Sequence, residues 1–243
     1  MGTSSARRGP TSWFWRRAKG AATRYLAPEV GTGLEAREVV SRYLAALEES
    51  AGVENQGLLG VFRLTRKAAQ NLGDFVGQAA TQGWETTLEA WGLAAGAGQP
   101  GELAAPALAG ILIEPDGSLE GAVARSSLAA VVREAGSARQ DRPAEMVTQF
   151  LAESLYQRLV LDLGEPLEAA GRSFGQWRQG LDGLRTWIAG VAAMAEPLEP
   201  PPPELWRGLA GWNWVTLTLE NLLRHLLTSP SPPTSPSGEG GNG

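Results

Sequence analysis

Apolar side chains recur every three or four positions through most of this 243-residue chain, a spacing that predicts helices rather than strands. The clearest segment runs from Ala144 to Leu163 and has one continuous apolar face. We expect that face to be buried, with the side chains of Met146, Phe150, Leu151, Leu155 and Leu159 in the core. No segment alternates convincingly with period two, and no internal repeat is visible. The pattern predicts an all-α fold, a single irregular domain of about nine helices.

Prolines, glycines and short polar stretches separate the predicted helices. Their ranges are 13–27, 34–50, 56–80, 84–93, 102–113, 119–135, 144–163, 173–195 and 205–227, with a possible further turn at 166–170. Ser118 follows a Pro-Asp-Gly turn, so we expect it to be the N-cap of the helix that starts at Leu119. Gly60, Gly73 and Gly77 each weaken the third helix by up to about 1 kcal/mol relative to alanine. Such glycines indicate that another element packs closely against that helix.

Both ends of the chain differ from this helical body. Residues 1–12 and 228–243 are rich in Gly, Ser, Thr and Pro, so we expect flexible tails on either side of a helical domain at 13–227. The net charge is −5, but residues 1–25 carry six basic side chains and no acidic one. The acidic remainder argues against a nucleic-acid-binding surface over the whole domain. Residues 1–25, which we call the basic head, could bind phosphate, an acidic partner or the protein's own acidic body.

Residues that commonly carry catalysis are scarce. The chain has no cysteine, and its one histidine, His225, is placed where a cation suits the end of a helix. The GxGxxG pattern at 96–101 has a predicted helix before it rather than a strand, so we interpret it as a loop. We therefore expect no enzymatic activity, no cofactor and no metal site. No apolar run approaches the roughly 18–20 residues that span a bilayer, so we expect no stable membrane insertion and a cytoplasmic location.

Nine tryptophans are a large number for this length. Four of them lie on predicted helices beside Leu or Phe and are expected in the core: Trp84, Trp91, Trp177 and Trp187. The other five lie near the ends of the helical domain, where aromatic side chains often form a contact surface: Trp13, Trp15, Trp206, Trp212 and Trp214.

Several short stretches together resemble the QatB family. They are MGTSS…GP at the start, Leu72-Gly73-Asp74-Phe75, Gly83-Trp84-Glu85 with Leu88, Gly117 to Arg125, and the Phe150-Leu151 helix ending at Leu163-Gly164. The resemblance covers roughly residues 1–165, and its motifs are apolar patterns rather than catalytic signatures. It implies a component of Qat anti-phage defence operons, which also encode an ATPase, a QueC-like enzyme (QatC) and a TatD-like nuclease.

The resemblance also implies a chemistry for the N-terminal tail. QueC makes a 7-deazaguanine nitrile from a carboxylate with ATP and ammonia, and QueC-like defence enzymes are thought to use a protein amine instead. The family member would then be the protein whose N-terminus receives the 7-deazaguanine through an amide. This sequence departs from the family expectation because its tail leads directly into Trp13-Phe14-Trp15, without a longer Pro-rich linker.

The residues of the tail suit such a substrate. Gly2 follows Met1, so removal of the methionine is expected to expose a glycine amine with a pKa near about 8, against about 10.4 for lysine. Glycine has no side chain to crowd the attack, and residues 2–12 can extend roughly 35–40 Å. We expect Gly2 to be the modified residue. The expected partner-binding residues are Thr3, Ser4, Ser5, Arg7, Arg8, Trp13, Phe14 and Trp15.

Two other functions fit the basic head. The Trp- and Arg-rich segment 13–26 could lie at a membrane surface, although Ala6 occupies the position where a myristoylation pattern needs Ser or Thr. It could also bind nucleic acid, with aromatic rings stacked on bases. An ordinary flexible N-terminus without any of these roles is the remaining interpretation.

Overall fold

The computed structural model describes residues 12–26, 35–52, 57–93, 104–135, 142–171, 173–195 and 198–228. Within these ranges the protein is helical and has no strand, which confirms the predicted fold class. The helices are α1 (Trp13–Leu26), α2 (Ala36–Ala51), α3 (Gly57–Val61), α4 (Arg63–Gln82), α5 (Trp84–Ala90), α6 (Ala104–Leu112), α7 (Leu119–Ala135), α8 (Pro143–Ala170), α9 (Phe174–Met194), the 3₁₀ turn η2 (Pro203–Leu205) and α10 (Leu209–Thr228).

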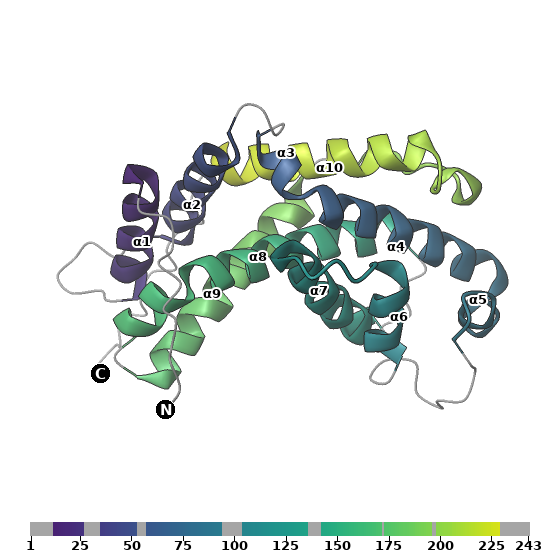
Figure 1. Ribbon diagram of the computed structural model, residues 1–243, viewed down its shortest axis with the longest axis horizontal. Coiled ribbons are helices and arrows are strands. Elements are labelled where there is room, and N and C mark those ends of the chain that lie inside the picture. The colour runs from purple at the N-terminus through teal and green to yellow at the C-terminus, as the bar shows by residue number, and fades with distance from the viewer. Residues whose placement is uncertain are drawn as a thin grey trace, which may run out of the picture.

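Helix α8 is the centre of the fold. α1, α4, α7 and α9 pack along it, and α10 also touches it. Figure 1 shows α1 and α2 at one end of the molecule, α5 and α6 at the other, and α10 lying along one side. The five α8 side chains predicted to be buried are all at most 1% exposed, which confirms the prediction from periodicity.

The side chain of Trp206 packs into a notch in α4, the space that is left open because Gly73 and Gly77 have no side chain. A Cβ at Gly73 would clash with the Trp206 indole, and one at Gly77 would lie 3.4 Å from Pro203. The expected close packing at these two glycines is therefore confirmed. The contact-surface interpretation of Trp206 and Trp214 is wrong: they are 0% and 7% exposed, with ring centroids 5.2 Å apart. The notch in α4 lies far from Trp206 in sequence, and periodicity alone does not reveal it.

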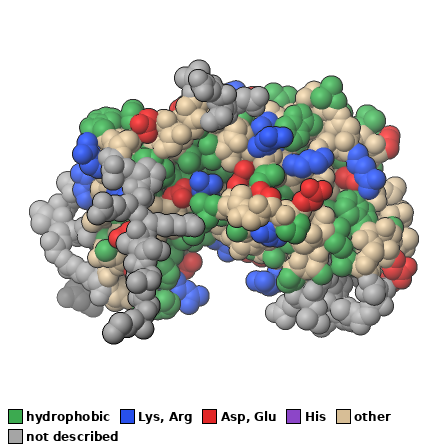
Figure 2. Space-filling model, in the orientation of Figure 1, with side chains coloured by type: hydrophobic (Ala, Val, Ile, Leu, Met, Phe, Trp, Pro, Cys, Tyr) green, Lys and Arg blue, Asp and Glu red, His purple; other side chains and the backbone are tan. Residues whose placement is uncertain are grey.

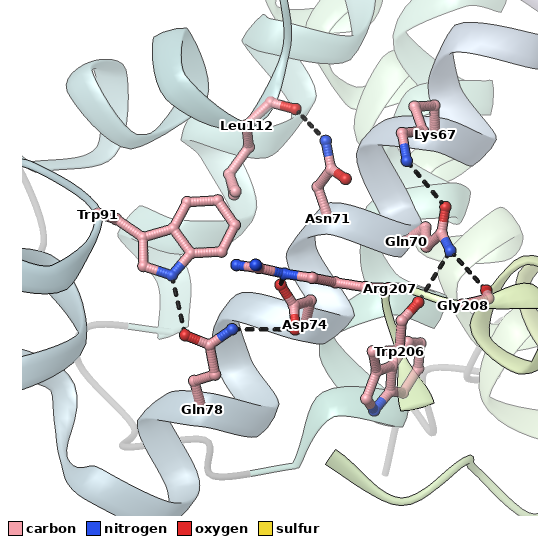
Figure 3. Close-up of polar contacts among 10 residues, drawn as sticks. All are labelled: Lys67, Gln70, Asn71, Asp74, Gln78, Trp91, Leu112, Trp206, Arg207 and Gly208. Atoms are coloured by element: carbon pink, nitrogen blue, oxygen red, sulfur yellow. Dashed lines mark hydrogen bonds and ion pairs between the residues drawn. The ribbon is translucent and has the colours of Figure 1, made fainter. Parts of the chain in front are cut away.

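Polar side chains of α4 also form hydrogen bonds with the segment 206–208, which precedes α10 (Figure 3). Gln70 donates its amide to the carbonyl oxygens of Trp206 and Gly208, each at 2.8 Å. Arg207 donates Nε to the buried carboxylate of Asp74 at 2.5 Å, and its guanidinium lies 5.3 Å from the centre of the Trp91 ring. The turn before α10 is thus fixed to α4 by apolar packing, by two hydrogen bonds from Gln70 and by one charge-assisted hydrogen bond from Arg207.

The predicted helix 56–80 is interrupted at Phe62, which leaves the helical conformation and separates α3 from α4. Phe62 is 2% exposed, so its side chain is part of the core at the break. A carboxylate from another helix caps the N-terminus of α4 that this break creates: Glu120 of α7 accepts the Thr65 amide at 2.9 Å. That cap offsets the free amide groups that a helix break creates.

Helix α8 continues to Ala170 and includes Pro166, seven residues beyond the confidently predicted end. Leu167 and Ala170 on the added turns are buried, at 0% and 9% exposure. Their packing offsets the cost of a proline inside a helix. Ser118, by contrast, is confirmed as an N-cap, since its hydroxyl accepts the Gly121 amide at 2.9 Å.

The notch in α4 gives a matched pair of glycine substitutions. We expect Gly73→Ala to destabilise the fold by about 1–3 kcal/mol or more, because the new methyl group overlaps the Trp206 indole. Gly164→Ala in α8 meets no atom within 4 Å and should stabilise the fold by about 0.5–1 kcal/mol. Urea denaturation of both variants measures the difference. Equal effects of the two substitutions would contradict the packing of Trp206 on Gly73.

Candidate partner-binding surface

Helix α1 is fastened to the body along one apolar face. Trp15, Ala18, Ala22 and Leu26 recur at helical spacing and are at most 3% exposed. This face packs against α2, α8 and α9. The small alanines let the helix axes approach closely, so α1 is part of the core rather than an appendage.

Hydrogen bonds fix the first turn of α1 to the end of α2. The Trp15 indole donates Nε1–H to the Ser50 hydroxyl at 2.6 Å. Ser12 donates its hydroxyl to the Glu49 carboxylate at 2.9 Å and accepts the Trp15 amide at 3.4 Å. The sequence places Ser12 in the tail at 1–12, but in the structure it caps α1 and belongs to the helical domain. Ser12, the first residue that the structure describes, is therefore anchored to the body.

The last turn of α1 is fixed to the first half of α9. The Tyr25 hydroxyl donates to the Gly180 carbonyl at 3.1 Å, and Gln176 donates to the Leu26 carbonyl at 2.7 Å. A Cβ at Gly180 would clash with Leu26, so this glycine makes room for the end of α1. Burial raises the pKa of the Tyr25 hydroxyl, which keeps it a neutral donor at physiological pH.

The opposite face of α1 is aromatic and basic. Trp13 is 53% and Phe14 38% exposed, and their rings meet edge to face at a centroid distance of 5.0 Å. The Arg17 guanidinium lies 4.5 Å from the centre of the Trp13 ring, a cation–π contact that orients both side chains. Figure 2 shows hydrophobic and basic side chains side by side over α1. We call Trp13, Phe14, Arg16 and Arg17 the α1 head.

The arginines of α1 are exposed cations. Arg16, Arg17 and Arg24 are exposed, and α1 has no acidic side chain. None of these arginines forms an ion pair with another residue that the structure describes. Tryptophan and arginine are the residue types that most often dominate binding energy at protein interfaces. The α1 head therefore has the composition of a docking surface for an acidic partner.

The structure separates the predicted partner-binding residues into three groups. Gly2, Thr3, Ser4, Ser5, Arg7 and Arg8 lie outside the described residues. Trp13 and Phe14 are exposed on α1, as a docking surface requires. Trp15 points the other way, into the core, where its ring packs edge to face with Tyr43 at 6.0 Å. The docking surface retains Trp13 and Phe14 and loses Trp15.

Sequence reasoning also overlooked Arg16 and Arg17 as members of this surface. The signal was present, because residues 1–25 contain no acidic residue with which these arginines could pair locally. Their helical spacing from Trp13, three and four positions, places them next to its ring.

The motifs that carry the family resemblance have structural roles. Leu72 and Phe75 are fully buried, and Phe75 packs edge to face on Trp84 and Trp91 at 5.2 and 5.7 Å. Gly117 has a φ of 68°, which favours glycine, and Ser118 caps α7. Glu120 of the same motif caps α4 in turn. These residues join α4, α5 and α7 rather than form a reaction centre.

Other chemistry is sparse in the part of the chain that the structure describes. It contains no group of three His, Asp or Glu side chains that could hold a metal ion. The His225 Nδ1 lies 2.8 Å from the Asn221 carbonyl oxygen, one turn earlier in α10, as in an ordinary helix-end contact. None of the described helices combines the length and the apolarity that a membrane-spanning helix needs.

Comparison with known families gives a match. The family model for QatB, Qat anti-phage system associated protein QatB, matches residues 61–195, which is more than half of the chain. The match begins just before α4 and ends after α9, so it includes the central helix α8 and the glycine notch. No curated protein and no solved structure matches the chain.

The two faces of α1 predict opposite effects of two neighbouring tryptophan substitutions. Trp15→Ala should destabilise the fold by about 3–5 kcal/mol, because it removes a buried ring and leaves Ser50 without its indole partner. Trp13→Ala should change the free energy of unfolding by only about 0.5 kcal/mol, since Trp13 is half exposed. Urea denaturation distinguishes them. A large loss of stability from Trp13→Ala would show that the α1 head is structural rather than free for binding.

Proposed function

The chain belongs to the QatB family, and from this membership we propose that it is a non-catalytic anti-phage defence protein that presents its N-terminus to a QueC-like enzyme (QatC). In this proposal the amine of Gly2 receives a 7-deazaguanine. The ATPase and the TatD-like nuclease of the same operon are proposed as further partners.

The proposed reaction needs little from this chain apart from an accessible amine. The Gly2 nitrogen would form an amide bond with the carboxyl carbon of a 7-deazaguanine carboxylate that the partner has activated with ATP. One carboxylate oxygen leaves with the activating group, and the nitrogen gives up a proton. A glycine amine with a pKa near about 8 is partly neutral at pH 7 and can therefore act as the nucleophile.

The observation that carries the proposal is the α1 head at the base of the tail. Ser12 and Trp15 are hydrogen-bonded to α2, so the point from which the tail starts is fixed relative to the body. Trp13, Phe14 and the exposed arginines of the α1 head lie immediately beside that point. If the partner docks on the α1 head, the first eleven residues are close to its active site, and roughly 35–40 Å of extended chain can reach inside it.

The membrane-surface alternative is less well supported. A helix that lies in a membrane interface inserts a broad apolar face between the lipids. The apolar face of α1 is already buried against the body, and only Trp13 and Phe14 at its first turn remain for a lipid contact. The nucleic-acid alternative has the basic side chains but must bring phosphates towards an acidic body.

Modification of Gly2 can be tested by intact-protein and peptide mass spectrometry. Protein co-expressed with its QueC-like partner should lack Met1 and carry an adduct of 7-deazaguanine size on Gly2. Replacing Gly2 with a bulky residue that retains Met1 should abolish the adduct, since the free amine is then on a different atom. Substitutions at 231–243 serve as the control and should leave it intact.

The contradicting outcome is an unmodified Gly2 amine in a complex with active partner enzyme, ATP and the deazaguanine carboxylate supplied. In that case the chain would bind the enzyme without being its substrate.

Docking on the α1 head can be tested separately from the chemistry. The double variant Trp13→Ala, Arg17→Glu should weaken binding to the purified QueC-like enzyme at least tenfold, and more at low than at high salt. Phe174→Ala, Arg178→Glu is a matched control, because Phe174 is 72% and the Arg178 side chain 71% exposed on another helix. Calorimetry measures both affinities. Equal losses of affinity in the two double variants would overturn the assignment of the docking surface. If the Trp13→Ala, Arg17→Glu variant binds weakly but still carries the adduct on Gly2, tight docking is not required for the reaction.

A further inference from the structure

A groove of about 890 Å³ opens between α7, α8, α9 and α10. Its walls are apolar and mostly small, and include Val131, Ala152, Ala192, Leu198, Trp214 and Leu222. Trp214 is held in place because its indole donates to the Leu198 carbonyl at 3.3 Å. The volume is large enough for one or two aromatic side chains, and the small wall residues leave the centre free.

The groove has an acidic rim. Among the described residues its lining includes Glu134, Glu145 and Glu153, against one basic side chain, Arg185. Arg185 is engaged by Glu153 at 2.7 Å and by Glu134 at 3.5 Å. Burial opposes the charge on Arg185, but these two carboxylates raise its pKa overall, so it stays charged. Glu134 pairs with Arg185 and Glu145 with Arg142, but their side chains are 67% and 50% exposed, so a further cation can approach both from outside.

The α1 head is complementary to this groove in both respects. It offers Trp13 and Phe14 as exposed rings and Arg16 and Arg17 as cations without an ion-pair partner among the described residues. The groove offers a small-walled apolar cavity and, among its described lining residues, three carboxylates against one arginine. An interface of this kind has an aromatic centre and a charged periphery, as stable protein contacts usually do.

The head and the groove of one molecule cannot meet. α1 is fixed at its first turn to Glu49 and Ser50 of α2, and no residue of α2 lines the groove. Its last turn is fixed at Gly180, whereas the part of α9 that lines the groove starts at Arg185. Any α1 head in the groove therefore comes from another molecule.

We propose that the α1 head of one copy inserts Trp13 and Phe14 into the groove between α7, α8, α9 and α10 of a second copy. Arg16 and Arg17 then face Glu134 and Glu145 of that copy. Because head and groove are different surfaces, the contact is either reciprocal within a closed dimer or repeats from molecule to molecule. This inference goes beyond the proposed function and does not depend on it, but self-association would cover the surface proposed for the QueC-like enzyme. Assembly and enzyme docking are therefore expected to compete.

Charge reversal on each side, with the full-length chain and no partner, tests this contact. Light scattering after size exclusion should show a mass above the 25.7 kDa of one chain that rises with protein concentration and falls with added salt. Arg16→Glu with Arg17→Glu, and Glu134→Arg with Glu145→Arg, should each weaken self-association at least tenfold. Arg24→Glu, an exposed arginine at the other end of α1, is the control and should leave it unchanged. Circular dichroism checks that every variant is folded.

Mixing the two charge-reversed variants is the decisive step. The acidic head of one variant matches the basic groove of the other, so an equimolar mixture should associate although each variant alone does not. A native chain that remains at 25.7 kDa at every concentration would overturn the proposal. So would a mixture that fails to associate, or self-association that survives both charge reversals. Binding of the QueC-like enzyme is read separately, so failure of either claim leaves the other testable.

Discussion

The burial of α8 is the constraint on which the rest of the structure depends. This helix of 28 residues has buried side chains on several sides, from Met146 near its start to Ala170 at its end. A helix that is apolar on more than one side must be covered on more than one side. Five helices provide that cover, namely α1, α4, α7, α9 and α10. The position of each is set by the part of α8 on which it packs. α1 is thus held by the core, although it lies at the start of the described chain and carries the exposed aromatic head.

This arrangement explains why a chain with so little catalytic chemistry can have a defined functional surface. The alanines of α1 and the glycine at 180 bring its axis close to α2, α8 and α9, and this leaves Trp13, Phe14 and the arginines outside. Ser12, the first described residue, therefore has a fixed position beside a fixed cluster of rings and charges. Binding energy at the head is not spent on ordering α1, because the body has already ordered it.

Much of the fold could be predicted from the sequence, because amphipathic helices repeat their apolar residues with a characteristic period. The buried face of α8, the cap at Ser118 and the close approach at Gly73 all follow from local patterns. The break at Phe62 could not be predicted, because the carboxylate that accepts the Thr65 amide at the start of α4 comes from Glu120, 55 positions away in the chain. The burial of Trp206 was equally hidden, since the notch that receives it lies on another helix. Both the break at Phe62 and the burial of Trp206 depend on tertiary contacts, which local sequence patterns do not reveal.

The candidate site was only partly predictable for a related reason. Trp13, Phe14 and Trp15 are consecutive, and consecutive residues on a helix point in directions about 100° apart, so all three cannot share one surface. The spacing of Trp15 from Ala18, Ala22 and Leu26 places it on the buried face, and that signal was available in the sequence. Which face of α1 is buried, however, depends on α2, α8 and α9.

The central claim is that α1 is a fixed part of the body and carries the docking head, and native-state amide hydrogen exchange tests it most directly. The account predicts that amides of α1 after its first turn exchange only through openings nearly as costly as those of α8, because α1 covers the core. Exchange of α1 amides at the rate of an unfolded peptide, while α8 remains protected, would contradict the account and leave the head without a fixed base.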